Sequence, residues 1–471
     1  TGFSVANSCR FNDGDSAYMH NTLSSGDGSD VKGTVSFWTK RGNLGTNQAI
    51  ISGKKGNTER VTIGFSSDDY FEIQFQDDTN AYNWRSTAVY RDIAAWYNFV
   101  IHLDTGNATA NSRAKVWLNG VEITEWGTRE AVPQSLKIGF FNGSDGNKRL
   151  VGARGGSSVD KFYDGYIAEV VVLNNTLDAA TNFGEYDEDS PTIWKPIDVS
   201  GLTFGTHGFY LDFEASDNLG NDANGGTDFT EVNLAATDQM TDSPTNNACT
   251  MNPLDNYYGA QTYSEGNLQM VSPSGNASCP HSTFGLTSGR WYAEAKMSAQ
   301  GADQTFIGIS SNISTETDFH LGKGATSYGM YSSSGSWYTN NGSANSYGVS
   351  WTTNDIIGIY LDLTSNKLYF AKNGTIMNSG TGIDITAPAS TELGAYFFSG
   401  MQWDNSTSAT LKGFIVSSGG GSVNTISSGN TDANDYGNFE YDPSDGGGSS
   451  FDSAAKDFLA VNSKNLGSDG G

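Results

Sequence analysis

The sequence predicts an all-β protein with two antiparallel β-sandwich domains, a polar linker between them and a glycine-rich carboxyl-terminal tail. Its 471 residues include 58 glycines and only 17% charged residues, a composition typical of short strands joined by many turns. The aromatic content of 12% supplies the large apolar side chains that packed cores need. Apolar residues recur with a period of two in both halves of the chain, as they do in strands with one buried face.

Residues 1–196 are expected to form the first sandwich. Phe71, Ile73 and Phe75 alternate with polar residues, which predicts a strand with one face in water. The dipeptide Asn119-Gly120 separates two apolar stretches and favours the positive φ angles of a two-residue type I′ hairpin turn. Further strands are predicted at residues 61–65, 96–103, 136–141 and 166–173, and a helical turn or two within residues 177–183.

Residues 197–250 are expected to form a polar connector, because one strand-like piece at 209–213 is followed by a run rich in Gly, Asn, Asp and Thr. Residues 251–417 are expected to form the second sandwich, in which Asn373-Gly374 marks another hairpin turn. The strands predicted there are residues 291–297, 306–310, 328–331, 356–363 and 368–370.

Residues 418–471 are expected to form a glycine-rich tail that is largely flexible or ordered only by a partner. Runs of three glycines at 419–421 and 446–448 offer no side chains for burial. One amphipathic segment, residues 451–466, could dock as a short helix or strand, with a helical turn or two within residues 454–461.

The charge balance and the hydropathy limit the classes of partner. Acidic residues outnumber basic residues by 52 to 26, and the formal net charge of −26 disfavours a nucleic-acid partner. No run approaches the roughly 20 apolar residues that span a bilayer, so membrane insertion is not expected. The chain begins with Thr1, which leaves open whether a segment precedes it. Three cysteines are expected to be buried thiols, with a Cys249–Cys279 disulfide as the alternative.

Motifs of the common enzyme classes are missing, so a non-enzymatic protein is expected. The sequence has no GxSxG elbow, phosphate-binding loop, GxGxxG turn or HExxH pair, and its five histidines are scattered, which predicts structural or surface roles for them. Glu185 and Asp187 could share a strand face, as a pair of glycosidase carboxylates would. Because Ser190-Pro191 follows without apolar alternation, a solvated acidic loop is expected, and a polysaccharide depolymerase remains an alternative.

No cofactor is expected, although calcium remains open. Loops rich in Gly and Asn carry carboxylates that could provide oxygen ligands for calcium, but none has the EF-hand spacing and no ligand set is assigned. These carboxylates belong to Asp13, Asp15, Asp217, Asp222 and Asp228.

A group of aromatic and amide residues in the second domain is the candidate ligand site. Aromatic rings stack on the C–H faces of sugars, while amides bind sugar hydroxyl groups. A buried, structural role is expected for the nearby Trp351. The candidate ligand-binding residues are Trp337, Tyr338, Asn340, Asn341 and Tyr347.

Two stretches of sequence resemble known domain families. The segments at 11–18 (FNDGDSAY), 116–120 (VWLNG) and 162–170 (FYDGYIAEV) resemble laminin-G-like, concanavalin-type domains. The segments at 288–294 (SGRWYAE) and 355–362 (DIIGIYLD) resemble SPRY domains. Both families have jelly-roll-like β-sandwich folds, so the resemblance implies two such domains.

The order of these domains, with the joint DSPTNN at 242–247 and MNPL at 251–254, is similar to large structural proteins of marine bacteriophages described as tail-fibre or virion-appendage proteins. This resemblance implies a protein on the virion surface, with other virion proteins and a host-surface glycan or protein as partners. A structural virion part, such as a capsid decoration or tail scaffold, is the alternative. A homo-oligomer is compatible with this resemblance, although no heptad or collagen-like stalk is present to enforce one.

Overall fold

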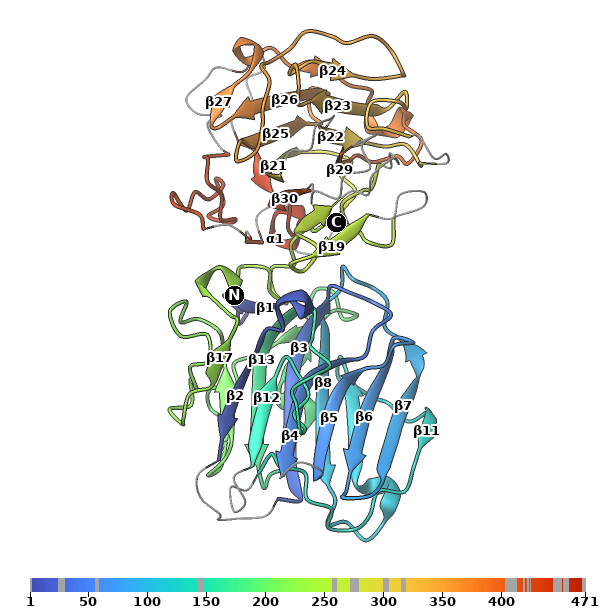
Figure 1. Cartoon of the computed structure of the whole chain (residues 1–471), viewed down its shortest axis with the longest axis vertical. Helices are drawn as coiled ribbons and strands as arrows, with labels where there is room; N and C mark the ends of the chain where they lie inside the picture. The colour runs from blue at the N-terminus through green and yellow to red at the C-terminus, as the bar shows by residue number, and fades with distance from the viewer. Residues whose placement is uncertain are drawn as a thin grey trace. The chain divides into compact units, whose positions relative to one another are not determined.

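The chain folds into two compact units, Thr1–Asn246 and Asn247–Gly471, and in both the regular secondary structure is almost entirely β-strand (Figure 1). The prediction of an all-β protein is therefore confirmed. The computed structural model describes residues 2–23, 30–55, 59–141, 147–255, 261–271, 279–299, 305–314, 319–402, 413–417, 420–421, 423, 425–443, 451 and 457–467.

The first unit is a sandwich of two antiparallel sheets. In sheet order, one contains β10 (Val121–Glu122), β9 (Ala114–Leu118), β8 (Tyr97–Asp104), β3 (Lys32–Arg41), β13 (Gly165–Asn174), β1 (Ser8–Phe11) and β18 (Gln239–Met240), with β16 (Phe209–Leu211) on β13. The other contains β11 (Trp126–Arg129), β7 (Ala81–Val89), β6 (Tyr70–Gln76), β5 (Glu59–Phe65), β4 (Gln48–Lys55), β12 (Lys148–Val151), β2 (Tyr18–Thr22) and β17 (Thr230–Val232). A separate hairpin pairs β14 (Gly184–Tyr186) with β15 (Trp194–Pro196).

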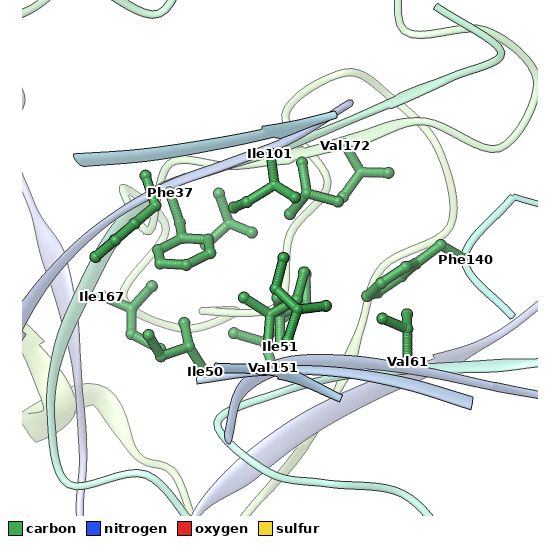
Figure 2. Packing of buried hydrophobic residues seen from close by; sticks show 14 of the residues in the cluster. Phe37, Ile50, Ile51, Val61, Ile101, Phe140, Val151, Ile167 and Val172 are labelled. Atoms are coloured by element: carbon green, nitrogen blue, oxygen red, sulfur yellow. The ribbon is translucent and has the colours of Figure 1, made fainter. Parts of the chain in front are cut away.

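Apolar side chains from the inner faces of the two sheets form the core of this unit. Figure 2 shows Phe37 and Ile101 pointing from one sheet toward Ile51 and Val61 of the other. The alternation predicted at residues 71–75 is confirmed, because alternate residues of β6 are buried. The predicted Asn119-Gly120 hairpin is also confirmed: the turn joins β9 to β10, and its two residues have φ angles of 45° and 79°.

The strand predicted at residues 136–141 is wrong, although its apolar side chains are buried in the core. The carboxylate of Asp30 accepts hydrogen bonds from the backbone N–H groups of Gly139 (3.0 Å) and Phe141 (3.2 Å). These donors are therefore paired with a side chain and not with a neighbouring strand. Burial raises the pKa of Asp30 to about 6. The predicted turn within residues 177–183 is confirmed as the short 3₁₀ helix Ala180–Asn182.

The connector predicted at residues 197–250 is wrong for most of its length, because this segment completes the first sandwich. β16 pairs with β13, β17 with β2, and β18 with β1, so the segment adds a strand at several places in both sheets. Asp242 ties the end of the segment to the core: its carboxylate binds Nζ of Lys40 (2.8 Å) and Nε1 of Trp96 (3.1 Å). A polar composition identified loops here, but not the strand partners that lie far away in the sequence.

The second unit also contains two sheets. In sheet order, the larger contains β19 (Thr262–Ser264), β20 (Gln269–Val271), β30 (Gly413–Ser417), β21 (Arg290–Ala299), β25 (Ile356–Asp362), β26 (Lys367–Lys372) and β27 (Thr375–Ile376), with β28 (Ile383–Asp384) on β26 and β31 (Leu459–Ala460) on β21. The smaller contains β24 (Trp337–Tyr338), β23 (Ser327–Tyr331), β22 (Thr305–Ser310) and β29 (Phe397–Gln402). The strands predicted in this domain are confirmed as parts of β21, β22, β23, β25 and β26, and Asn373-Gly374 forms the predicted turn into β27.

The expectation of a largely flexible tail is wrong for its described residues, which pack on the larger sheet, and the glycine run at 446–448 lies outside the described residues. Phe439, Phe451 and Phe458 are buried against tyrosines on the face of this sheet opposite to the core between the sheets. The carboxylate of Glu294 accepts hydrogen bonds from the backbone N–H groups of Glu440 (3.0 Å) and Tyr441 (2.8 Å).

The amphipathic segment within the tail docks as expected, through β31 and the short helix α1 (Ser463–Leu466). The helical turn predicted within residues 454–461 lies partly outside the described residues, and its described end forms β31. The docked tail therefore has a definite place in the fold of the second unit.

Two further expectations concern thiols and membranes. Cys9, Cys249 and Cys279 are buried free thiols, as expected, so the alternative Cys249–Cys279 disulfide does not form. In the part of the chain that the structure describes, no helix has the length and apolar character needed to cross a bilayer.

A buried acid in the first unit predicts a pH dependence of stability. Glu169 is 5% exposed and accepts a 2.7 Å hydrogen bond from the hydroxyl of Tyr210. Burial is the main cause that raises its pKa to about 8, and the nearby carboxylates of Asp212, Glu214 and Asp198 act in the same direction. The folded protein therefore keeps this proton up to about pH 8, whereas the unfolded chain loses it near its ordinary value of 4.5.

The contribution of Glu169 to stability is accordingly present below pH 4.5 and is lost as the pH rises from 4.5 to 8. Replacing Glu169 with Gln should remove this contribution, with a relative gain on the order of 2–3 kcal/mol at pH 9 compared with pH 5. Urea unfolding of both proteins at the two pH values measures the difference. An unchanged pH dependence in the variant would contradict the assignment.

Candidate functional site

The ligand-binding residues predicted in the second unit lie on an edge strand and in the loop that follows it. Trp337 and Tyr338 form β24, at the edge of the smaller sheet. Both side chains are half-buried and contact other aromatic rings. The ring centroid of Trp337 lies 6.2 Å from that of Tyr328, and the ring centroid of Tyr338 lies 5.7 Å from that of Phe306. Much of their aromatic surface is therefore used in packing, which leaves less of it for stacking on a ligand.

Asn340 and Asn341 are exposed, and they turn the chain after β24. Their φ angles are 52° and 50°, a conformation that Asn tolerates better than most residues. Their backbone N–H groups bind the carbonyl oxygens of Gly324 and Gly322, which leaves the side-chain amides at the surface. The structure thus brings four of the five predicted residues together on one edge.

Tyr347, the fifth predicted residue, belongs largely to the core. It is 7% exposed, and its ring packs edge-on against Phe370 at 6.1 Å. Tyr347 was expected to bind a ligand, but its ring is covered by the core and offers no open face for stacking. The predicted burial of Trp351 is confirmed, at 2% exposure.

Tyr347 nevertheless lines a pocket of about 580 Å³ beside the β26–β27 hairpin. Val349, Lys372 and Met377 also line it. The ammonium group of Lys372 is engaged, since it pairs with Asp355 (3.0 Å) and donates to the carbonyl oxygen of Ser350 (2.9 Å). This pocket offers mainly apolar contacts and one cation that is already neutralised.

The first unit has a more polar pocket, of about 230 Å³, on the face of the β2–β12–β4 strands that points away from the core. We call it the Tyr18–Lys148 pocket. Tyr18 and His20 enter it from β2, Lys148 from β12 and Lys54 from β4. Its wall is completed by Leu150 and by residues 155–159, whose sequence GGSSV places little side-chain bulk over the strands.

The register of the strands explains why these side chains meet. Lys148 lies directly opposite Lys54 on the neighbouring strand, and His20 lies opposite Leu150. Successive strand residues point to opposite faces, so residues 18 and 20 share the outward face while Met19 is buried in the core. The ring of Tyr18 lies 5.9 Å from that of His20 in a stacked arrangement.

The charged side chains that line the Tyr18–Lys148 pocket are both cationic, although the protein as a whole is strongly acidic. Among the described residues, Lys54, Lys148 and the neighbouring Arg60 make no ion pair. The ammonium group of Lys54 donates one hydrogen bond, to the carbonyl oxygen of Gly156 in the pocket wall (2.7 Å). Burial lowers the pKa of Lys54, and the positive charges of Lys148 and Arg60 lower it further. The pKa of His20 is lowered by burial and then by Lys148. The pocket can therefore offer cationic donors and an aromatic ring to an anionic ligand with apolar C–H faces.

Sequence reasoning did not find this site, because its members are strand residues that lie far apart in the chain and belong to no motif. Structural or surface roles were expected for His20, and the lysines stood in no motif. The run of small residues at 155–158 was the single local signal, and such runs usually mark plain turns.

Most of the acidic residues considered for catalysis or metal binding contact other groups of the protein. Lys195 contacts the carboxylates of Glu185 (3.6 Å) and Asp187 (3.1 Å), and its hydrogen bond is the main cause that lowers the pKa of Asp187. Asp13 and Asp15 each accept a hydrogen bond from an asparagine amide. In the described ranges, no group of three or more His, Cys, Asp or Glu side chains could hold a metal ion.

Comparison with known families finds a match within each unit. Residues 13–181 match the family described as the Concanavalin A-like lectin/glucanases superfamily, and residues 290–412 match the SPRY domain family. The chain therefore carries a concanavalin A-like domain followed by a SPRY domain. No curated protein matches the chain.

Three solved structures that are similar to parts of the chain come from a human protein, a horseshoe-crab species and a bacterium, and each has low sequence identity to it. The SPRY domain of human HERC1 is 17% identical, with a TM-score of 0.27, over 37% of this chain and 99% of that one. A heptameric SAP-like pentraxin from Limulus polyphemus is 15% identical, with a TM-score of 0.28, over 38% and 80%. Domain 4 of an extracellular arabinanase from Geobacillus stearothermophilus, in complex with arabinotriose, is 18% identical, with a TM-score of 0.24, over 32% and 64%.

Proposed function

We propose that this chain, a concanavalin A-like sandwich followed by a SPRY sandwich, is a non-enzymatic attachment protein on the surface of a bacteriophage virion. In this proposal it binds an acidic glycan of the host cell surface. The observation that carries the binding function is the Tyr18–Lys148 pocket, in which two lysines without a carboxylate partner among the described residues lie beside an aromatic ring. The order of the two domains along the chain supports the virion assignment through its similarity to bacteriophage appendage proteins.

Two lysines face each other on neighbouring strands of the pocket, and their mutual repulsion favours an anionic ligand. Like charges directly opposite each other on neighbouring strands destabilise a sheet. Lys54 and Lys148 occupy such a pair, and no carboxylate of the described residues neutralises them. The protein has 52 acidic residues from which a partner could have come. An anionic ligand in the pocket would remove the repulsion and would gain charge-assisted hydrogen bonds.

An aromatic ring next to cationic donors suits an acidic sugar. The ring of Tyr18 can contact the C–H face of a pyranose while the ammonium groups bind its acidic substituent. A pocket of about 230 Å³ holds one sugar unit at most, so each copy should bind weakly. Many copies on one particle would convert this into firm attachment through avidity.

Replacing Lys148 with Glu should weaken binding to an acidic polysaccharide roughly tenfold or more, because the variant loses a charge-assisted hydrogen bond and places an anion in the pocket. Lys115 provides a matched control, since it is an exposed lysine on β9 of the other sheet. The same change at Lys115 alters the net charge equally and should leave the affinity nearly unchanged. Isothermal titration with the full chain measures both variants, and equal losses in the two would contradict a specific site.

The biological part of the proposal is tested by binding of the labelled, purified chain to intact bacteria from a panel of hosts. Selective and saturable binding that the Lys148→Glu variant loses is the expected result. Failure to bind any host, even after artificial multimerisation, would favour a structural role in the virion. Release of reducing ends from the bound polysaccharide, lost on Glu185→Gln, would instead indicate a depolymerase.

A further inference from the structure

A second pocket in the first unit, of about 350 Å³, contains a buried arginine without an ion-pair partner. It lies at the end of β2 and β12 and shares no lining residue with the Tyr18–Lys148 pocket. Asn21, Arg149, His207 and Asp222 line it together with the loop at 225–227. We call it the Arg149 pocket.

Arg149 is 3% exposed, and its guanidinium is held in a fixed position. One Nη donates to the carbonyl oxygen of His207, and the other donates to Oδ1 of Asn21 at 3.0 Å. The rings of Phe209 and Phe229 lie 4.6 and 5.4 Å from the guanidinium carbon. Its Nε is buried and has no hydrogen-bond partner among the described residues.

Other buried cations of this unit show how unusual this arrangement is. Arg10, Lys40 and Arg41 are each paired with a carboxylate at 2.8–3.0 Å. Arg113 has no carboxylate partner, but all three of its guanidinium nitrogens donate to backbone carbonyl oxygens. Arg149 has neither arrangement, although burying a charge without an ion-pair partner is strongly unfavourable.

Asp222 lines the same pocket but does not pair with Arg149. Its carboxylate accepts hydrogen bonds from the backbone N–H groups of Tyr210 in β16 (2.9 Å) and of Asn224 in the following loop (3.1 Å). Burial lowers the pKa of Arg149 to about 9, against the opposing effect of Asp222, so the guanidinium remains mostly charged at neutral pH. The pocket therefore holds a cation with unused hydrogen-bonding capacity.

We propose that the Arg149 pocket binds the anionic group of a small acid of about the size of one sugar ring, either a carboxylate or a sulfate ester. The planar guanidinium matches the geometry of both oxyanions. The pocket volume lies near the lower end for small-molecule sites, which suits one ring and not a chain. This inference does not depend on the Tyr18–Lys148 pocket.

The test measures the unfolding midpoint of the full chain in the presence of glucuronate, galactose 6-sulfate, glucose or acetate at equal ionic strength. A saturable rise is expected with one or both of the acidic sugars and not with glucose or acetate. The two acidic sugars distinguish a carboxylate from a sulfate ester as the preferred group.

Three variants locate the effect. Arg149→Lys keeps the charge but loses the planar donors, and it should weaken binding at least about tenfold. Thr206→Trp changes an exposed residue of the pocket wall and should block the pocket without altering Arg149. Lys148→Glu should leave this binding intact, which separates it from the function proposed above.

Several results would overturn the proposal. These are the absence of a rise with both acidic sugars, an equal rise with glucose or acetate, and a rise that Thr206→Trp does not diminish. A rise lost only in Lys148→Glu would assign the acidic sugars to the Tyr18–Lys148 pocket and would likewise overturn it.

Discussion

Replacing Asp242 with Ala should lower the free energy of unfolding of the first unit by about 3–5 kcal/mol. The ammonium group of Lys40 is fully buried, and Asp242 is its ion-pair partner at 2.8 Å. The variant removes this counter-ion of a buried charge and also removes the acceptor for Nε1 of Trp96. Urea unfolding of the full chain, followed by tryptophan fluorescence, measures the loss.

The double variant Lys40→Met, Asp242→Leu is the matched control. Removing both charges replaces the ion pair by apolar contacts of similar volume, and most of the lost stability should return. A loss below about 0.5 kcal/mol in Asp242→Ala would instead show that residues 197–246 behave as the connector that composition suggested.

Replacing Phe458 with Ala should lower the free energy of unfolding of the second unit by a similar amount, about 3–5 kcal/mol. Phe458 is fully buried, and its ring lies 5.1 Å from that of Tyr360 and 5.3 Å from that of Phe451. The substitution opens a cavity between the tail and the larger sheet and exposes the tyrosine face. Unfolding by urea, followed by circular dichroism, quantifies the effect.

The adjacent Asp457 offers a close control, because it is exposed. Asp457→Ala should change the stability by no more than about 0.5 kcal/mol. If the two variants were equally stable, the tail would be the flexible segment expected from its glycines, and its burial against the sheet would be refuted.

Local sequence patterns predicted the strands and turns correctly where the structure depends on residues that are neighbours in the sequence. Alternation in residues 71–75 and the Asn119-Gly120 turn both depend on neighbours in the sequence, and both are confirmed. The strand expected at 136–141 had the correct burial but the wrong hydrogen bonding. Its backbone donors bind Asp30, more than 100 residues away, and no local pattern contains that information.

In the candidate site, too, local sequence predicted some features, and contacts between distant segments decided others. Aromatic and amide composition selected residues 337–341, and the structure places them on one edge strand but turns much of the ring surface inward. Tyr347 was selected by the same composition, but the structure places it in the core. The Tyr18–Lys148 pocket was not predicted from the sequence, because its side chains come from three strands that the register of the sheet brings together.

The sequence by itself determined the all-β class, the two sandwiches, most of their strands and the acidic surface, because side-chain periodicity, turn chemistry and net charge are local or additive properties. Only the tertiary structure decided which strands residues 209–240 join, where the tail docks and which cations lack partners. Those outcomes depend on pairing between distant segments, and the burial of Arg149 and the opposition of Lys54 and Lys148 arise only once the sheets have formed.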